Sequence, residues 1–143
     1  MGKYEWIDMK DAMDIAISLT EKYKDNFGHI DACRLRFIAL TDQQQTKDGC
    51  KIWNFNSLPD PLNEIFGIDI VVTINFDSWS NLDDKARAIV VASMLSCIDW
   101  KERLVSKGYD LRDSKSMIIN FGVDYENNPD VPDILNTYYD WRN

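Results

Sequence analysis

Histidine is almost missing from this sequence, with His29 as the single one among 143 residues. Any Ser-His-Asp or Cys-His arrangement for nucleophilic catalysis would have to use that one side chain. The GxSxG, Walker A and GxGxxG patterns are absent as well. Their absence argues against a hydrolase with a nucleophile elbow, a P-loop protein and a dinucleotide-binding domain.

Cysteine is also scarce. Cys33, Cys50 and Cys97 are odd in number and lack CxxC spacing, so the sequence indicates neither a disulfide framework nor a cysteine zinc site.

No stretch approaches the roughly 20 apolar residues of a membrane span, and residues 1–10 lack the apolar core of a signal peptide. We therefore expect a cytoplasmic protein, and the sequence points to no cofactor.

Basic residues are outnumbered, because 16 Lys and Arg stand against 24 Asp and Glu and leave a net charge of −8. The excess lies in residues 41–80, with 2 basic and 6 acidic groups, and in residues 121–143, with 1 and 5. Affinity for a phosphate backbone depends on Lys and Arg displacing counterions, so direct nucleic-acid binding is disfavoured. The acidic charge serves either solubility or attraction to a basic surface, including one that normally holds nucleic acid.

The apolar pattern predicts one α+β domain over residues 1–143. Strand patterns lie at residues 34–40, 50–55, 68–76 and 116–123. Helix patterns lie at residues 9–27, shortly after the two prolines of 57–67, at about 82–106 and from 129 onward. We expect Asp8 to cap the first helix, Gly28 to end it and Ser80-Asn81 to cap the long one. This order predicts a mixed sheet packed on a long central helix, with N- and C-terminal helices.

The central helix is apolar nearly all round between Ala88 and Ile98, which predicts burial on most sides. One face is formed by Ala86, Ile89, Ser93, Cys97 and Trp100. Small residues on such a face are typical of a helix that packs closely on a sheet. Ser93 and Cys97, one turn apart, also have the spacing of a pair of metal ligands.

Two stretches within residues 49–97 carry a more specific pattern. "PLNEIFGIDIVVTINFDSW" has a Pro-Leu-Asn turn, an apolar strand and an acidic-tryptophan end, and "LDDKARAIVVASMLSC" supplies a helix after it. The combination resembles the putative phage metallopeptidase family, small zincin-like proteins of phages and prophages. Members of that family end this helix in an HExxH motif. An ungapped alignment from Leu82 puts Ser93 and Cys97 at the two histidines and Met94 at the glutamate.

The departures from that motif concern the chemistry directly. A zincin needs two neutral imidazoles to hold zinc and a carboxylate between them to take a proton from the bound water. Serine is a very poor zinc ligand, methionine cannot act as a general base, and the single thiol of Cys97 does not make a site. His29 matches no ligand position. We therefore expect neither a metal site nor peptidase activity by the family's route.

Aromatic residues are plentiful. Trp53, Trp79 and Trp100 are expected in the core, whereas Trp141 is equally compatible with packing and with partner contact. Near the C-terminus, acidic and aromatic side chains form a candidate partner-binding set: Asp124, Glu126, Asp130, Asp133, Tyr138, Tyr139, Asp140 and Trp141. The alternative is a solvated tail and helix.

A zincin-like scaffold without its metal site is expected to persist for binding. We hypothesise a non-catalytic inhibitor of the anti-CRISPR or anti-restriction type, which occupies a basic nucleic-acid-binding groove on a host effector and touches neither nucleic acid nor membrane. Two alternatives stay open. One is a degenerate metallopeptidase-like enzyme with residual metal binding, and the other is a structural or assembly component of a phage particle.

Overall fold

The computed structural model describes residues 5–40, 53–100, 104–106, 120–121 and 130–141. Its helices are α1 (Lys10–Lys22), α2 (Lys24–Phe27), α3 (Leu62–Phe66), α4 (Phe76–Ser80) and α5 (Asp84–Ser96), with a 3-10 turn at Ala32–Arg34. Its strands are β1 (Trp6–Asp8), β2 (Leu35–Leu40), β3 (Trp53–Ser57), β4 (Ile70–Asn75), β5 (Ile98–Trp100) and β6 (Leu104–Ser106). The prediction of an α+β fold is confirmed.

The main sheet is mixed and has the strand order β1-β2-β4-β3. β2 and β4 run parallel, with Leu35 opposite Ile70, whereas β1 and β3 pair antiparallel at the two edges. β5 and β6 form a separate antiparallel pair. β4 therefore lies between two other strands, which explains why its sequence is a nearly continuous β-branched run.

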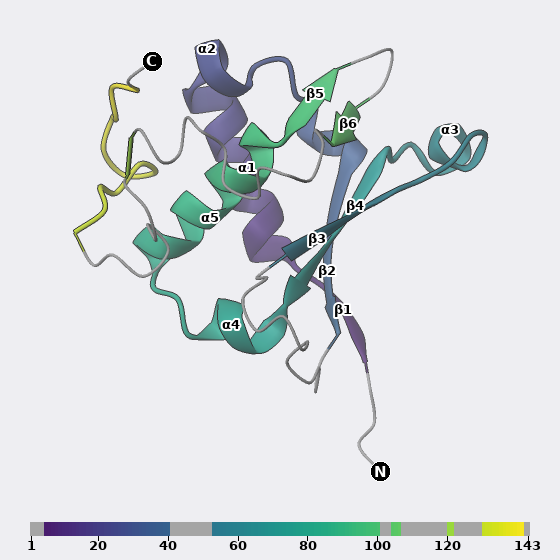
Figure 1. Cartoon of the computed structure of the whole chain (residues 1–143), viewed down its shortest axis with the longest axis horizontal. Helices are drawn as coiled ribbons and strands as arrows, with labels where there is room; N and C mark the ends of the chain where they lie inside the picture. The colour runs from purple at the N-terminus through teal and green to yellow at the C-terminus, as the bar shows by residue number, and fades with distance from the viewer. Residues whose placement is uncertain (1–4, 41–52, 101–103, 107–119, 122–129, 142–143) are drawn as a thin grey trace.

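Helices α1 and α5 lie on one face of this sheet and against each other (Figure 1). The buried side chains of α1 include two alanines, Ala12 and Ala16, which allow a close approach of the helices. The sheet contributes its alternate residues to the same core: Leu35, Phe37, Ala39, Ile70, Val72 and Ile74. Ala88 to Leu95 of α5 are all buried, so the predicted burial of the central helix is confirmed.

The first helix differs from the prediction at its start. Asp8 does not cap it, because Asp8 belongs to β1 and pairs with Ile38. The capping position is Met9, which makes no side-chain capping bond. The helix is also interrupted at Tyr23, which separates α1 from α2. Gly28 ends α2 as predicted, and a Cβ there would lie 2.4 Å from the carbonyl oxygen of Lys24.

The long helix is shorter than predicted at both ends. Ser80 and Asn81 end α4, a helix that the sequence pattern did not reveal, and Asp83 caps α5 instead. At the other end α5 stops at Ser96 rather than near residue 106, and the chain continues into β5. No Gly or Pro lies between residues 82 and 107 to signal this stop, which comes from pairing of β5 with β6. In the described ranges, no helix has both the length and the apolar character needed to cross a bilayer.

The predicted C-terminal helix is wrong for residues 130–141, which form a turn at 134–136 and no helix. Asp133 accepts a hydrogen bond from the backbone N–H of Asn136 at 3.2 Å. Lys22 Nζ, which lies far away in the sequence, donates to the carbonyl oxygens of Ile134, Leu135 and Thr137. In a helix these oxygens would accept from the helix's own backbone N–H groups. Both features favour a turn over continued helix.

Candidate functional site

The motif positions of α5 are set by the way the helix begins. Asp83 Oδ1 accepts a hydrogen bond from the backbone N–H of Ala86 at 2.8 Å. This bond satisfies a donor that has no partner within the helix. Asp84 follows in the first turn, where the helix dipole favours a carboxylate. The apolar run that begins there places Ser93 and Met94 in the last turn and Cys97 at its end.

This last turn is closed off from solvent. Ser93 and Met94 are 0% exposed and Cys97 is 9% exposed. The backbone N–H of Cys97 donates to the carbonyl oxygen of Met94 at 3.0 Å. Around them, α5 packs on α1, α2 and β5. The structure therefore brings the three predicted motif positions together, within the hydrophobic core.

The donor set at this turn does not fit a catalytic zinc ion. The hydroxyl of Ser93 is a poor ligand, the thioether of Met94 cannot take a proton, and Cys97 alone offers a good ligand atom. Within the residues that the structure describes, no three His, Cys, Asp or Glu side chains gather closely enough to hold a metal ion. These side chains supply neither a metal cage nor a base for a metal-bound water.

The single histidine lies beside the end of α5. His29 Nε2 is 3.2 Å from the carbonyl oxygen of Ile98, the first residue of β5. A carbonyl oxygen only accepts, so we assign the proton to Nε2. This hydrogen bond ties the loop after α2 to β5. The imidazole therefore has a structural partner on the backbone.

The acidic-aromatic set near the C-terminus separates into two groups. Asp124 and Glu126 lie outside the described residues. Among the others, the exposed side chains are Asp130, Tyr138 and Asp140, and the half-buried ones are Asp133, Tyr139 and Trp141. The exposed members lie at the surface, whereas the half-buried ones also pack into the fold.

Trp141 belongs to an aromatic cluster. Its ring meets those of Tyr23, Phe27, Phe121 and Tyr139 nearly edge-on, at centroid distances of 5.7, 5.5, 5.3 and 5.3 Å. Edge-to-face pairs at such distances add to the stability gained from burial. Of the two interpretations of Trp141, the geometry therefore supports packing.

Of the predicted core tryptophans, Trp79 is buried, and its Nε1 donates to Asp11 Oδ2 at 2.8 Å. Trp53 is half-buried and packs against the core. The side chain of Trp100 lies outside the described part of the chain. Trp79 thus connects α4 to α1.

Two residues at the end of α1 hold the C-terminal segment, and sequence reasoning missed both. Lys22 Nζ donates to the carbonyl oxygens of Ile134, Leu135 and Thr137 at 3.0, 2.8 and 2.7 Å. The Tyr23 hydroxyl donates to the Ile134 carbonyl and accepts from the backbone N–H of Tyr139 at 2.9 Å. Burial, the main cause, raises the pKa of Tyr23. We call Lys22 and Tyr23 the clasp.

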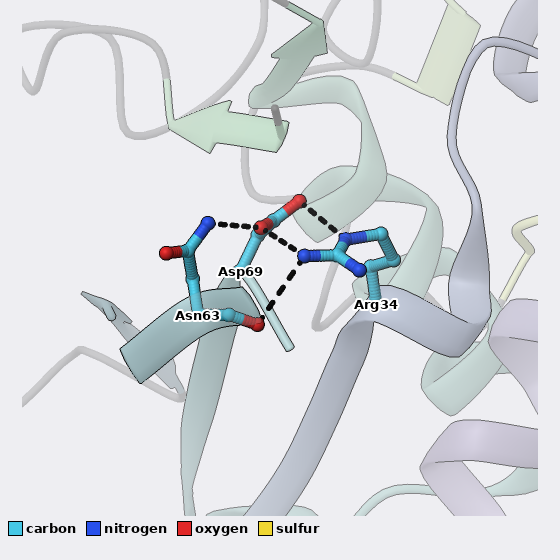
Figure 2. Close-up of polar contacts among 3 residues, drawn as sticks. All are labelled: Arg34, Asn63 and Asp69. Atoms are coloured by element: carbon cyan, nitrogen blue, oxygen red, sulfur yellow. Dashed lines mark hydrogen bonds and ion pairs between the residues drawn. The ribbon is translucent and has the colours of Figure 1, made fainter. Parts of the chain in front are cut away.

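A buried carboxylate where the β3–β4 connection returns to β4 was also missed. Asp69 is fully buried, and Arg34 donates two hydrogen bonds to its carboxylate (Figure 2). Arg34 Nε donates to Oδ2 at 2.9 Å, and a terminal guanidinium nitrogen donates to Oδ1 at 2.8 Å. The side-chain Nδ2 of Asn63 donates to the same carboxylate at 3.3 Å, and the backbone carbonyl oxygen of Asn63 accepts from Arg34. The hydrogen bond with Asp69 raises the pKa of Arg34. No clear signal in the sequence pointed to this network, because Asn63 and Asp69 stand in a stretch that also contains the exposed Asp60 and Glu64.

This network fixes the segment that carries α3. Gly67 ends α3 in the left-handed conformation, with φ of 70°, which glycine adopts without steric cost. The backbone N–H of Ile68 then donates to the backbone carbonyl oxygen of Asn63. The backbone N–H of Leu58 donates to the backbone carbonyl oxygen of Asp69. Figure 1 shows α3 standing away from α1 and α5, at the end of the β3–β4 hairpin. We call residues 58–69 the arm tip.

The comparisons with known proteins gave one relationship. A family model described as "putative phage metallopeptidase" matches residues 4–138, nearly the whole chain. No curated protein and no solved structure matches the chain at a significant level. The match extends well beyond the resemblance seen in residues 49–97 and includes the β1–β2 pair, the arm tip and α5. The chain therefore belongs to the putative phage metallopeptidase family.

Proposed function

We propose that this protein acts by binding and not by metal-dependent peptide hydrolysis. The observation that carries the proposal is the burial of Ser93, Met94 and Cys97 at the end of α5. These are the residues that the sequence alignment assigns to the HExxH positions. A general base must reach its substrate through hydrogen-bond distance or one water. A hydroxyl, a thioether and a thiol enclosed in the core cannot together hold a catalytic metal ion. None of them can reach a substrate as a general base.

We further propose that the target is a basic groove of a host nucleic-acid-handling protein, such as a CRISPR effector or a restriction enzyme. The net charge of −8 supports an acidic ligand for such a groove. Residues 52–84 contain no Lys or Arg, and exposed carboxylates there are Asp60, Glu64, Asp77, Asp83 and Asp84. Asp130 and Asp140 add exposed negative charge near the C-terminus.

The test is displacement of a fluorescently labelled duplex or guide RNA from purified effectors with basic grooves. The protein should release the nucleic acid from its target at low salt, and its affinity should fall by about tenfold or more as salt screens the charges. A variant with Asp60→Asn and Glu64→Gln should bind more weakly, whereas Glu21→Gln with Asp25→Asn, which removes two exposed charges on α1 and α2, is the matched control. Binding of no effector, or equal affinity at low and high salt, would contradict the proposal.

Two simple measurements address the alternatives. Stoichiometric zinc in the purified protein, measured by elemental analysis, would favour a degenerate enzyme with residual metal binding. A defined homo-oligomer in size-exclusion chromatography would favour a structural or assembly component of a phage particle. A monomer without bound metal is the result expected for an acidic inhibitor.

A further inference from the structure

The arm tip carries a cluster of exposed apolar side chains. Among the described residues, five large hydrophobic side chains are exposed, and three of them are on α3. Leu62 is 41% exposed, Ile65 is 68% exposed and Phe66 is 64% exposed. Single exposed apolar residues are common, but three within five positions on one short helix form a patch.

These side chains are not needed to hold the arm tip in place. The tip is fixed by polar contacts from Asn63, Asp69 and Arg34, by Gly67, and by backbone hydrogen bonds. Ile65 and Phe66 are mostly exposed and bury little apolar surface in the fold, so fold stability does not explain their exposure. A contact with another molecule would account for it.

The charge around the patch indicates what kind of molecule that is. Asp60 and Glu64 are exposed beside the apolar side chains, and residues 52–84 contain no Lys or Arg. Arg34 is the cation at the base of the tip, and it is engaged by Asp69. The patch is therefore apolar with an acidic rim. Such a surface is complementary to an apolar pocket bordered by Lys or Arg.

The same charges disfavour two other occupants. A second copy of this chain also carries a net charge of −8, so two tips repel each other at close range. A membrane surface is anionic in its common forms and repels Asp60 and Glu64 as well. A basic protein surface is the occupant that the charges favour.

We propose, as an extension of the binding function proposed above, that α3 is the anchor of the interface. Leu62, Ile65 and Phe66 insert into an apolar pocket of the partner protein, and Asp60 and Glu64 face the basic residues that border it. Interface anchors are typically large apolar or aromatic side chains surrounded by a polar rim. Phe66 is the aromatic side chain of the patch.

The experiment begins with a photo-reactive benzoylphenylalanine at position 66 in the full-length chain, produced in host cells. The control places it at position 6, because Trp6 is exposed to a similar extent, 60%, on β1. A cross-link at position 66 and none at position 6 is expected, and mass spectrometry identifies the partner. That partner is then purified for direct binding measurements.

Phe66→Ser and Ile65→Ser should each weaken binding to the purified partner by about tenfold or more. Glu64→Lys should weaken it through charge repulsion, and Trp6→Ser should change it by less than about twofold. The thermal unfolding midpoints of Phe66→Ser and Ile65→Ser should match that of the unmodified chain, which shows that lost binding is not lost folding.

Several results would overturn the proposal. These are no cross-link at position 66, equal binding by Phe66→Ser, a cross-link to a second copy with a concentration-dependent dimer, or binding to phosphatidylcholine vesicles that requires Phe66.

The two proposals can also fail separately. If an effector is displaced equally well by the unmodified chain and by Phe66→Ser, the inhibitor function stands and the α3 anchor falls. If the cross-linked partner binds through α3 but has no nucleic-acid groove, the anchor stands and the inhibitor function falls.

Discussion

The hydroxyl of Tyr23 donates a hydrogen bond to the carbonyl oxygen of Ile134 at 2.6 Å, although 111 positions separate the two residues. The same hydroxyl oxygen accepts from the backbone N–H of Tyr139 at 2.9 Å. One side chain thus satisfies two backbone groups of a segment that forms no helix of its own. The position of the C-terminal segment depends on the end of α1.

Replacing Tyr23 by phenylalanine removes these two hydrogen bonds, together with a longer one of 3.3 Å to the Thr137 carbonyl oxygen, and keeps the ring in the aromatic cluster. We expect the free energy of unfolding to fall by about 1–3 kcal/mol, because the backbone N–H of Tyr139 loses the acceptor that Tyr23 provides, whereas the Ile134 carbonyl oxygen keeps its bond from Lys22. Denaturant titration followed by tryptophan fluorescence measures the change. Tyr138→Phe is the control, since Tyr138 is exposed. Equal effects of the two substitutions would contradict the structural role of the Tyr23 hydroxyl.

The raised pKa of Tyr23 also predicts a dependence of stability on pH. Burial disfavours the phenolate, so the folded-state pKa lies above the ordinary value of 10.0. The folded chain therefore holds this proton more tightly than the unfolded chain does. The stabilisation is fully present below pH 10.0 and is lost as the pH rises through the folded-state pKa. Thermal melts across this range should show a steeper alkaline loss for the unmodified chain than for Tyr23→Phe.

Lys22 makes the second half of the clasp. Its ammonium group donates to three carbonyl oxygens, and charge-assisted hydrogen bonds are stronger than neutral ones. Lys22→Met keeps the aliphatic stem and should lower the free energy of unfolding by about 1–2 kcal/mol. Lys24→Met, two positions away at an exposed site, should change it by less than about 0.5 kcal/mol. Faster proteolysis at the C-terminus of Lys22→Met is the accompanying result.

The arm tip gives a different kind of prediction. Arg34→Met leaves the buried carboxylate of Asp69 without its cation, which is among the more destabilising changes known for ion pairs. We expect the thermal unfolding midpoint to fall by roughly 10 °C. Arg36→Met is the control, because Arg36 is half exposed and its closest carboxylate, Asp8, is 3.9 Å away. A similar small shift for both variants would show that the Arg34–Asp69 pair is not important for stability.

Local sequence signals predicted some of this fold well and missed other parts for physical reasons. The β-branched run of β4 and the stop at Gly28 depend on neighbouring residues alone, and both were found. The end of α5 at Ser96 depends on pairing of β5 with β6, and the course of residues 130–141 depends on Lys22 and Tyr23. Contacts between distant segments carry no local signal, and so these features were missed.

The same distinction holds for the candidate site. Ser93, Met94 and Cys97 lie together at the end of α5, as their spacing in the sequence predicts, because spacing along a helix is a local property. Their assignment to the family motif stays a prediction. Their burial depends on the packing of α1 and α2 against α5 and could only be inferred from the apolar run. The Arg34–Asp69 pair, which joins residues 35 positions apart, has no spacing rule that would reveal it.

Restoration of the family motif tests how far this turn has diverged from a metal site. The triple variant Ser93→His, Met94→Glu and Cys97→His supplies the two imidazoles and the carboxylate. All three new side chains would lie in the core, where larger groups overpack and a carboxylate is poorly solvated. We therefore expect a loss of about 3 kcal/mol or more of stability and no stoichiometric zinc.

Ser93→Ala, the matched control at the same turn, should cost less than about 1 kcal/mol. A triple variant that folds normally and binds one zinc ion would mean that the turn can still open as a metal site, and the proposal of a purely binding function would then have to be abandoned.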